Sequence, residues 1–343
     1  MRNPGKKMNG LFLAMLLSYL LVSAAFALLA LRNIGGGVIV ALIAGELAVV
    51  LPGLVFLLLF RCDLSEWIPL KAVRFSTIAF SVLLTVLLQP LLYFLNIISQ
   101  FFIKNVAADL FAQTEGIPGP VLVLSIAIIG PLCEEISFRG ILLSGFRRTG
   151  RYFAAVLWTA FLFGLFHMNL NQFGYAMMIG FFCALTVEAT GSMIPALIIH
   201  IGTNGYNVLQ ALALQEISKL SGEDLASAVE QSGMITPDFL LKIAAVMLIP
   251  AVGGTILAFV VLIAMAKREG RKEHLLKILP FIGRRPDMSG EKSEENAEEY
   301  PEKGYLPEEE QKSSVISATG IIGVLICVFM IFFFERMLQM LGL

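Results

Sequence analysis

Long apolar runs alternate along the chain with short polar connections. Nine windows of about 15–28 residues contain few charged side chains, as transmembrane helices do. They cover residues 11–31, 38–60, 75–102, 121–146, 153–168, 175–189, 193–214, 239–265 and 318–338. The fifth and sixth windows are the shortest, and spans below about 17 residues need burial in protein or extension into their flanks. The pattern predicts an all-α bundle that crosses a membrane about nine times.

The composition agrees with this pattern. The chain is 57% hydrophobic and 15% charged, and its mean hydropathy of +0.81 lies far outside the range of soluble domains. The net charge of −1 comes with no basic patch interleaved with aromatic residues, so we expect no nucleic-acid partner. The four cysteines lie in or beside apolar runs, which indicates free thiols and not a disulfide framework. The first partner that the sequence predicts is therefore the lipid bilayer.

Basic residues indicate how the chain is oriented, because cytoplasmic loops carry the excess of Lys and Arg. They cluster before the first window and after the second, fourth and eighth windows. This distribution predicts a cytoplasmic N-terminus and an outside C-terminus. The first window continues well past an Ala25-Phe26-Ala27 triplet that resembles a cleavage site, so we interpret it as a signal anchor. Short loops and no retrieval signal favour a prokaryotic plasma membrane.

Two segments lie outside the windows. Residues 215–237 are mildly acidic and are expected to form an exterior loop. Residues 267–316 begin with a basic amphipathic stretch, which predicts an interfacial helix over 267–285 on the cytoplasmic leaflet. The rest of that segment has the composition of a disordered tract. His274 belongs to the amphipathic stretch, where we expect a solvated surface histidine.

The fourth window contains three ionisable residues, Glu134, Glu135 and Arg139. Charges inside a membrane cost several kcal/mol each unless they are paired. On a helix, Glu135 and Arg139 are four positions apart and share one face, whereas Glu134 points about 100° away. The spacing predicts a structural Glu135–Arg139 pair. Glu134 then either stays protonated or finds a histidine, as a general base requires, or it only joins an interhelical hydrogen-bond network.

Two of the three histidines, His167 and His200, also fall in apolar windows. His200 and Asn204 are four positions apart, so both side chains can reach one point. Counted at about 1.5 Å per residue from the inside boundaries, these residues and Glu134 lie at a similar depth of roughly 15–24 Å. A lone membrane histidine is more often an interhelical hydrogen-bonding residue than a ligand. Two histidines together with Glu134 nevertheless make a candidate site.

These residues belong to three short motifs that follow one another within the stretch 134–204. The motifs are Glu134-Glu135-x-x-x-Arg139, Phe163-x-x-x-His167 and His200-x-x-x-Asn204. In this order they resemble the motifs of the CPBP intramembrane proteases, the family of CAAX proteases, bacteriocin-processing enzymes and Abi self-immunity proteins. The resemblance covers roughly 118–210. We expect this catalytic core to lie between N-terminal spans (1–110) and a C-terminal part (211–343) that holds the loops and two further spans.

The resemblance implies a role for each motif residue. Glu134 would be the catalytic carboxylate and would share an activated water with His167. His200 and Asn204 would line an oxyanion hole. The supporting residues would be Glu135, Arg139 and Phe163. The implied activity is hydrolysis of a peptide bond in a peptide or protein substrate at the membrane, a reaction that needs a base for water and donors for the oxyanion.

A metal-dependent reading uses the same residues. Two histidines and one glutamate are the ligand set of a catalytic zinc site, here Glu134, His167 and His200. The usual His-Glu-x-x-His spacing is missing. We favour water activation with no cofactor, because Glu134 as a metal ligand would leave only Glu135 to act as the base.

Two other classes of protein remain open. Buried Glu and His residues also make proton relays in carriers, although the chain shows no inverted repeat. A non-catalytic self-immunity or scaffold protein could keep the same motifs for stability. Proteolysis by the purified protein separates these alternatives from a protease.

Overall fold

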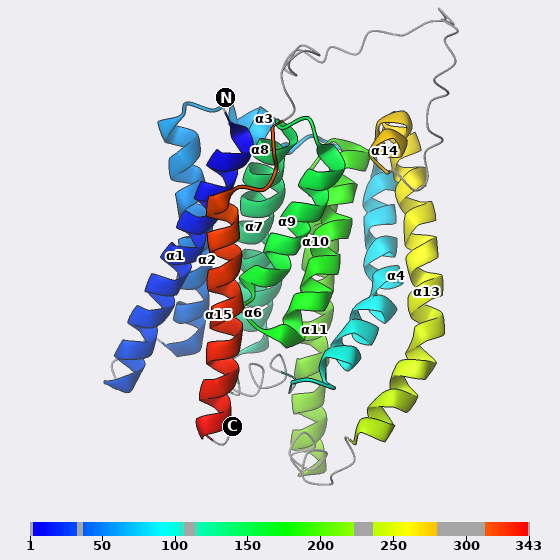
Figure 1. Ribbon diagram of the computed structural model, residues 1–343. Helices are drawn as coiled ribbons and strands as arrows, with labels where there is room; N and C mark the ends of the chain where they lie inside the picture. Colours follow the sequence, from blue (N-terminus) through cyan, green and yellow to red (C-terminus); the bar gives the residue numbers. More distant parts are fainter. Residues whose placement is uncertain are drawn as a thin grey trace, which may run out of the picture.

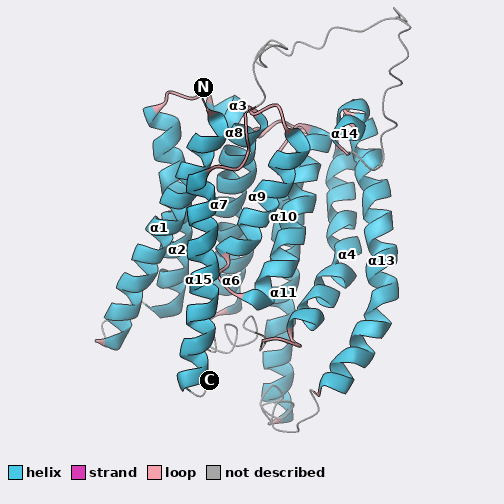
Figure 2. Cartoon of the chain, in the orientation of Figure 1, coloured by secondary structure: helices cyan, strands magenta, loops and turns pink. Residues whose placement is uncertain are grey.

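The computed structural model describes residues 3–32, 37–103, 105, 114, 116–222, 236–279 and 313–341. No strand occurs in this part of the chain, and the long helices run side by side along one axis (Figures 1 and 2). The two termini lie at opposite ends of the bundle (Figure 1). The predicted all-α helix bundle is confirmed.

A helix occupies each of the nine predicted windows. The elements in chain order are α1 (Pro4–Leu31), α2 (Gly37–Leu59), α3 (Leu64–Trp67), α4 (Phe75–Ser99), α6 (Gly119–Leu122), η1 (Val123–Ile129), α7 (Gly130–Glu135), η2 (Ile136–Leu142), α8 (Leu143–Arg147), α9 (Tyr152–Phe166), α10 (Leu170–Thr190), α11 (Ile194–Ser221), α13 (Pro237–Arg268), α14 (Lys272–Ile278) and α15 (Ala318–Leu341).

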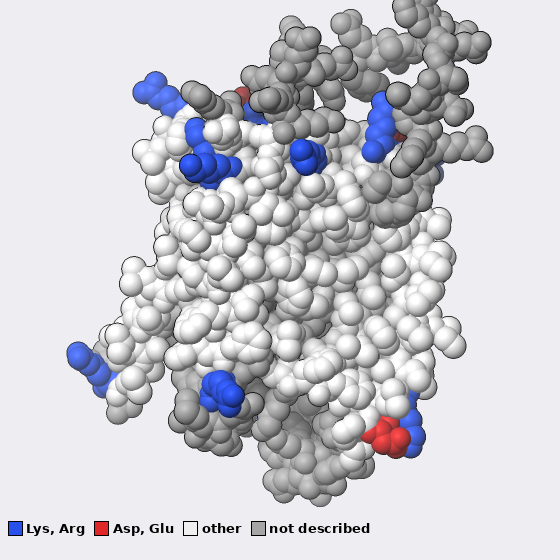
Figure 3. All heavy atoms as spheres, in the orientation of Figure 1, with Lys and Arg blue, Asp and Glu red and all other residues white. Residues whose placement is uncertain are grey.

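Within the described ranges, six helices are long and apolar enough to cross a membrane by length and composition: α1, α2, α4, the helix Gly119–Arg147, α10 and α13. The apolar helices Tyr152–Phe166 and Ala318–Phe333 are shorter. Figure 3 shows Lys and Arg gathered toward the two ends of the molecule, with a wide uncharged band between them. The chain is a multi-pass membrane protein by this pattern, and nine crossings remain a prediction.

The helix Gly119–Arg147 combines α6, η1, α7, η2 and α8, and we call it the composite helix. Its segments η1 and η2 are π-helical and lie on either side of α7, which ends at Glu135. The sequence predicted a helix here, which is confirmed, but it did not predict the two π-helical segments. π turns inside α-helices are rare and frequently occur at functional sites.

An aromatic cluster joins α1, the composite helix and α9. Phe138 lies 6.5 Å from Phe12, 5.0 Å from Phe163 and 5.7 Å from Phe166 between ring centroids, each in an edge-to-face arrangement. Such pairs add to the stabilisation that burial of the rings already gives. Because Phe12 is fully buried in this cluster, α1 is an integral part of the core.

A buried ionic cluster lies at the end of the bundle that carries the N-terminus. Glu188, near the end of α10, is fully buried, and its Oε1 lies 3.0 Å from Arg147 Nε at the end of the composite helix. Its Oε2 lies 2.8 Å from Nε2 of His274 in α14, and Arg271 Nε donates to the Glu188 carbonyl over 3.0 Å. The prediction that His274 is only a solvated surface residue is wrong, because its partner Glu188 comes from an element far away in the sequence.

The amphipathic stretch also differs from its prediction. Residues 267–268 end α13, a short α14 follows, and Leu275 and Leu279 are fully buried. The apolar side of α14 therefore packs against α10 and α13 and not against lipid. An amphipathic pattern alone does not show whether the apolar side of a helix contacts protein or lipid. Residues 280–312 lie outside the described part of the chain, and they include the end of the predicted interfacial stretch (280–285) and most of the expected disordered tract.

The predicted exterior loop 215–237 begins later than expected. Helix α11 continues through Ser221 and ends at Gly222, which adopts a left-handed conformation at φ 72°. On the other side, the Thr236 side chain accepts a hydrogen bond from the Phe239 amide and caps α13. Residues 223–235 lie outside the described part of the chain.

The Glu188 cluster yields a stability prediction. Glu188→Gln should lower the free energy of unfolding by about 3 kcal/mol, because it leaves Arg147 without its buried counter-charge. Thermal melting of the purified protein in detergent measures this loss. Glu216→Gln is the matched control, because Glu216 pairs with Lys219 at 66% and 65% side-chain exposure. Exposed pairs contribute little, so equal melting of the two variants would contradict the structural role of Glu188.

Candidate active site

Glu135 and Arg139 form the centre of the site. Arg139 Nη1 lies 3.1 Å from Glu135 Oε1, and the two side chains are 1% and 0% exposed. The guanidinium carbon of Arg139 lies 4.1 Å from the centroid of the Phe163 ring, a cation–π contact with α9. The predicted ion pair is therefore present in the structure. Arg139 also connects the composite helix to α9 through its contact with Phe163.

His200 on α11 lies between the two glutamates. Its Nδ1 is 2.8 Å from Glu135 Oε1, and its Nε2 is 3.3 Å from Glu134 Oε2. Arg139 is always charged and forms an ion pair with Glu135, so we assign Nδ1 of His200 as the donor to the Glu135 carboxylate. The second contact then needs one further proton, shared between Nε2 of His200 and the Glu134 carboxylate. The side chain of Glu134 is 14% exposed, and within the described ranges it pairs with no arginine.

His167 follows directly after α9. Its Nδ1 lies 3.0 Å from the carbonyl oxygen of Phe163, which can only accept, so Nδ1 is the donor. A neutral ring then presents a bare Nε2 that can take a proton or bind a ligand. The Phe163 ring contacts both histidines edge to face, at 5.0 Å from His167 and 5.6 Å from His200. Phe163 thereby fixes the spacing of the two imidazoles.

Asn204 lies one turn beyond His200 on α11. Its Nδ2 donates to the Ile126 carbonyl in η1 over 3.3 Å. An amide has two N–H donors, so one remains for another acceptor. The structure brings six of the predicted residues into one connected group and places the seventh, Asn204, beside it. The six are Glu134, Glu135, Arg139, Phe163, His167 and His200.

Residues 116–206 match the family model of type II CAAX prenyl endopeptidases, Rce1-like. The matched segment contains all three motifs and the complete group of charged residues described above. We call this segment the Rce1-like domain, after the family that it resembles. The resemblance to the CPBP proteases is confirmed at the level of this family. No curated protein and no solved structure matches the chain.

Two residues outside the Rce1-like domain also approach Glu134, and the sequence analysis missed both. Glu46 on α2 interacts electrostatically with Glu134, and its Oε2 is buried without a hydrogen-bond partner in the described part of the chain. Its Oε1 lies 3.6 Å from where a Cβ on Gly130 would stand, so the glycine leaves room for the carboxylate. Tyr19 on α1 interacts electrostatically with Glu46 and with Glu134.

A signal for Glu46 was present in the sequence. It is the one ionisable residue in the window 38–60, and ionisable residues inside a membrane are functional candidates by default. Tyr19 gave no comparable signal, because a tyrosine in an apolar helix is common. The electrostatic environment of Glu134 thus includes groups on α1 and α2, which precede the family segment.

The donor set of the metal-dependent alternative can be compared with this geometry. Both histidines have Nδ1 fixed by an oxygen acceptor, an arrangement that also orients zinc ligands. Among the residues that the structure describes, no three His, Cys, Asp or Glu side chains are grouped so that they could hold one metal ion. The metal-free reaction stays a prediction, with zinc as its alternative, and chelation tests the choice.

The ion pair gives the prediction of this subsection. Arg139→Ala should lower the free energy of unfolding by about 3–5 kcal/mol, because it leaves Glu135 buried without its partner. Lower expression and a lower melting temperature in detergent are the measurements. Lys242→Ala is the control, since Lys242 pairs with Asp238 at 73% and 71% side-chain exposure. Unchanged melting of Arg139→Ala with a selective loss of turnover would refute the structural assignment.

Proposed function

We propose that the protein is an intramembrane endopeptidase that hydrolyses a peptide bond in a membrane-associated peptide or protein. The Rce1-like domain supports membership of a protease family. The observation that carries the proposal is the difference between the two adjacent glutamates. Glu135 is neutralised by Arg139, whereas Glu134 contacts only histidine among its described ionic partners. Glu134 is therefore the carboxylate that is free to move a proton.

In the proposed reaction, water lies between Glu134 and the bare Nε2 of His167, which interact electrostatically. These groups take one proton from the water while its oxygen attacks the substrate carbonyl carbon. The Nε2–H group of His200 and the second side-chain N–H of Asn204 donate hydrogen bonds to the oxyanion. The C–N bond then breaks, and the proton taken from the water passes to the leaving nitrogen, which completes the hydrolysis.

The remaining motif residues support these groups. Glu135 holds Nδ1 of His200 at 2.8 Å and thereby directs Nε2 toward Glu134. Arg139 provides the counter-charge for Glu135, and Phe163 packs against Arg139 and both imidazoles. A catalytic constellation works only when its groups are held in the productive geometry, and this network supplies the support.

We further propose a plasma-membrane location, in a prokaryotic cell, with the N-terminal end of the bundle in the cytoplasm. Basic residues near the N-terminus, α8 and α14 support this orientation through the positive-inside rule. In Figure 1, these three elements lie at one end of the bundle. The substrate would then reach the site from within the bilayer or from one of its surfaces.

Glu134→Gln tests the proposed function. Purified wild-type protein in liposomes should cleave members of a library of membrane-associated peptides, with the products identified by mass spectrometry. Glu134→Gln should turn over at least about 10²-fold more slowly, because proton transfer by a positioned side chain contributes about 10²–10⁴-fold. Glu216→Gln, on the exposed surface, should match the wild type. A library left intact by the wild type, or equal cleavage by Glu134→Gln, would contradict the proposal.

Chelation tests the choice of a cofactor-free reaction. If Glu134 and His167 activate water directly, a strong chelator should leave turnover unchanged. Zinc held by Glu134, His167 and His200 would instead make activity fall on chelation and return with added Zn²⁺. Elemental analysis gives a second readout, because His167→Ala would then lose bound metal. Stoichiometric zinc that is lost together with activity would overturn the metal-free mechanism.

A further inference from the structure

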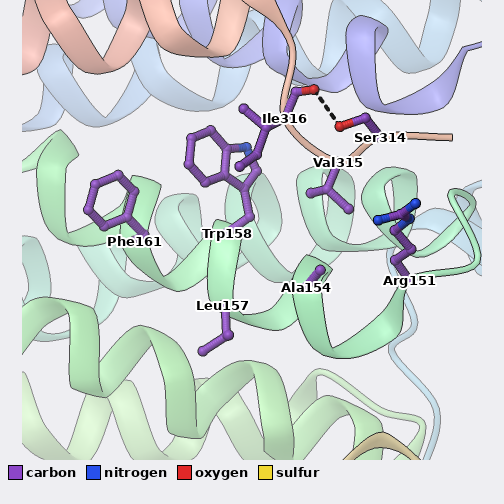
Figure 4. Close-up of a pocket in the computed structure, with 8 residues that line it drawn as sticks. All are labelled: Arg151, Ala154, Leu157, Trp158, Phe161, Ser314, Val315 and Ile316. Atoms are coloured by element: carbon purple, nitrogen blue, oxygen red, sulfur yellow. Dashed lines mark hydrogen bonds between the residues drawn. The ribbon is translucent and has the colours of Figure 1, made fainter.

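A hollow of about 430 Å³ lies between α9 and the segment that leads into α15 (Figure 4). Its volume falls within the range of about 300–1,000 Å³ that is typical of small-molecule sites. It is lined by Arg151, Ala154, Leu157, Trp158 and Phe161 and by residues 314–316. None of these residues belongs to the motif group, so the hollow is separate from the candidate active site.

The lining changes from charged to apolar along α9. Arg151 precedes the first residue of α9, while Trp158 and Phe161 lie about 10 and 15 Å further along the helix axis. The rings of Trp158 and Phe161 stack with a centroid distance of 5.6 Å and an interplanar angle of 23°. The indole N–H of Trp158 donates to Asn9 Oδ1 over 2.9 Å, so its one polar group is already bonded within the protein.

The opposite wall is fixed by hydrogen bonds. Asn9 Nδ2 donates to the Val315 carbonyl over 2.8 Å, which holds the segment against α1. Ser314 Oγ donates to the Ile316 carbonyl over 2.8 Å, as the dashed line in Figure 4 shows. The Val315 and Ile316 carbonyls and the Ser314 hydroxyl are thus hydrogen-bonded within the protein, and Val315 is 4% exposed. The hollow is a formed feature whose interior is predominantly apolar.

Arg151 differs from the two arginines before it in the chain. Arg147 pairs with Glu188, and Arg148 pairs with Glu66 over 3.0 Å. Arg151 is exposed and has no ion-pair partner in the part of the chain that the structure describes. A free guanidinium at the end of an apolar helix is suited to a phosphate oxygen, which it can contact through two N–H groups.

From these observations we propose that the hollow binds one anionic phospholipid. The phosphate contacts Arg151 at the rim, and one acyl chain lies along Trp158 and Phe161. The gradient from cation to apolar surface matches the order of headgroup and tail in a bilayer leaflet. The lipid would bridge α9 and the segment before α15, and it would stabilise the helix that carries Phe163. This inference does not depend on the proposed protease activity.

Native mass spectrometry of the full-length purified protein tests the proposal with two lipids of equal chain length. The wild type should retain phosphatidylglycerol about fivefold better than phosphatidylcholine, because one cation near the headgroup favours the anionic lipid. Arg151→Gln should abolish this preference. Arg268→Gln, which removes an exposed cation at the end of α13, should keep it. A preference that survives in Arg151→Gln, or that is lost equally in Arg268→Gln, would overturn the proposal.

Two further measurements distinguish the bound tail from the headgroup alone. Ala154→Phe fills the hollow and should reduce retention of both lipids, while thermal melting without lipid reports whether the variant folds. Leu157→Phe offers a second filling variant if Ala154→Phe does not fold. Phosphatidylglycerol should raise the melting temperature of the wild type, and inorganic phosphate should not. Equal stabilisation by inorganic phosphate would show a simple anion site and would also overturn the proposal.

Discussion

Placing charge inside an apolar bundle is the constraint on which the rest of the site depends. Glu135 and Arg139 are almost completely removed from solvent, and separating them would leave one charge with no compensation. The same Glu135 oxygen also accepts a hydrogen bond from His200. One carboxylate therefore orients an arginine from its own helix and a histidine from α11. Phe163 then packs against both of these cations or potential cations. A requirement of stability thereby sets the orientation of groups that would perform chemistry.

A second buried carboxylate is paired with basic partners near the N-terminal end of the bundle. Glu188, also fully buried, is held by Arg147 and by His274. Arg139 and Arg147 both lie in the C-terminal half of the composite helix. The Glu135 and Glu188 clusters therefore connect this helix to α10, α11 and α14. Among the residues that the structure describes, Glu134 and Glu46 differ from these carboxylates because neither pairs with an arginine. The arrangement separates carboxylates that hold the fold from carboxylates that remain available for proton transfer.

Local patterns account for what the sequence predicted well. The apolar windows predicted the positions of nine helices, and the spacing of Glu135 and Arg139 predicted their ion pair, because both depend on neighbours within one helix. The contact between Glu188 and His274 joins elements 86 positions apart, and no periodicity encodes it. The burial of Leu275 was missed for a similar reason, since lipid and a protein core favour the same amphipathic pattern. The π segments have no residue signature in the printed sequence, although they lie directly before and after the segment that ends at Glu135.

The extent of the family match bears on which parts of the chain influence Glu134. The Rce1-like domain contains the motif residues, but Tyr19 and Glu46 approach Glu134 from helices that precede it. Met8 on α1 contacts the composite helix where Gly145 leaves space, so these helices pack closely against the domain. The electrostatic environment of Glu134 is consequently a property of the whole bundle and not of residues 116–206 alone. If the motif groups supply the hydrolytic chemistry that we propose, then Tyr19 on α1 and Glu46 on α2 influence the key carboxylate from outside the segment that matches the family model.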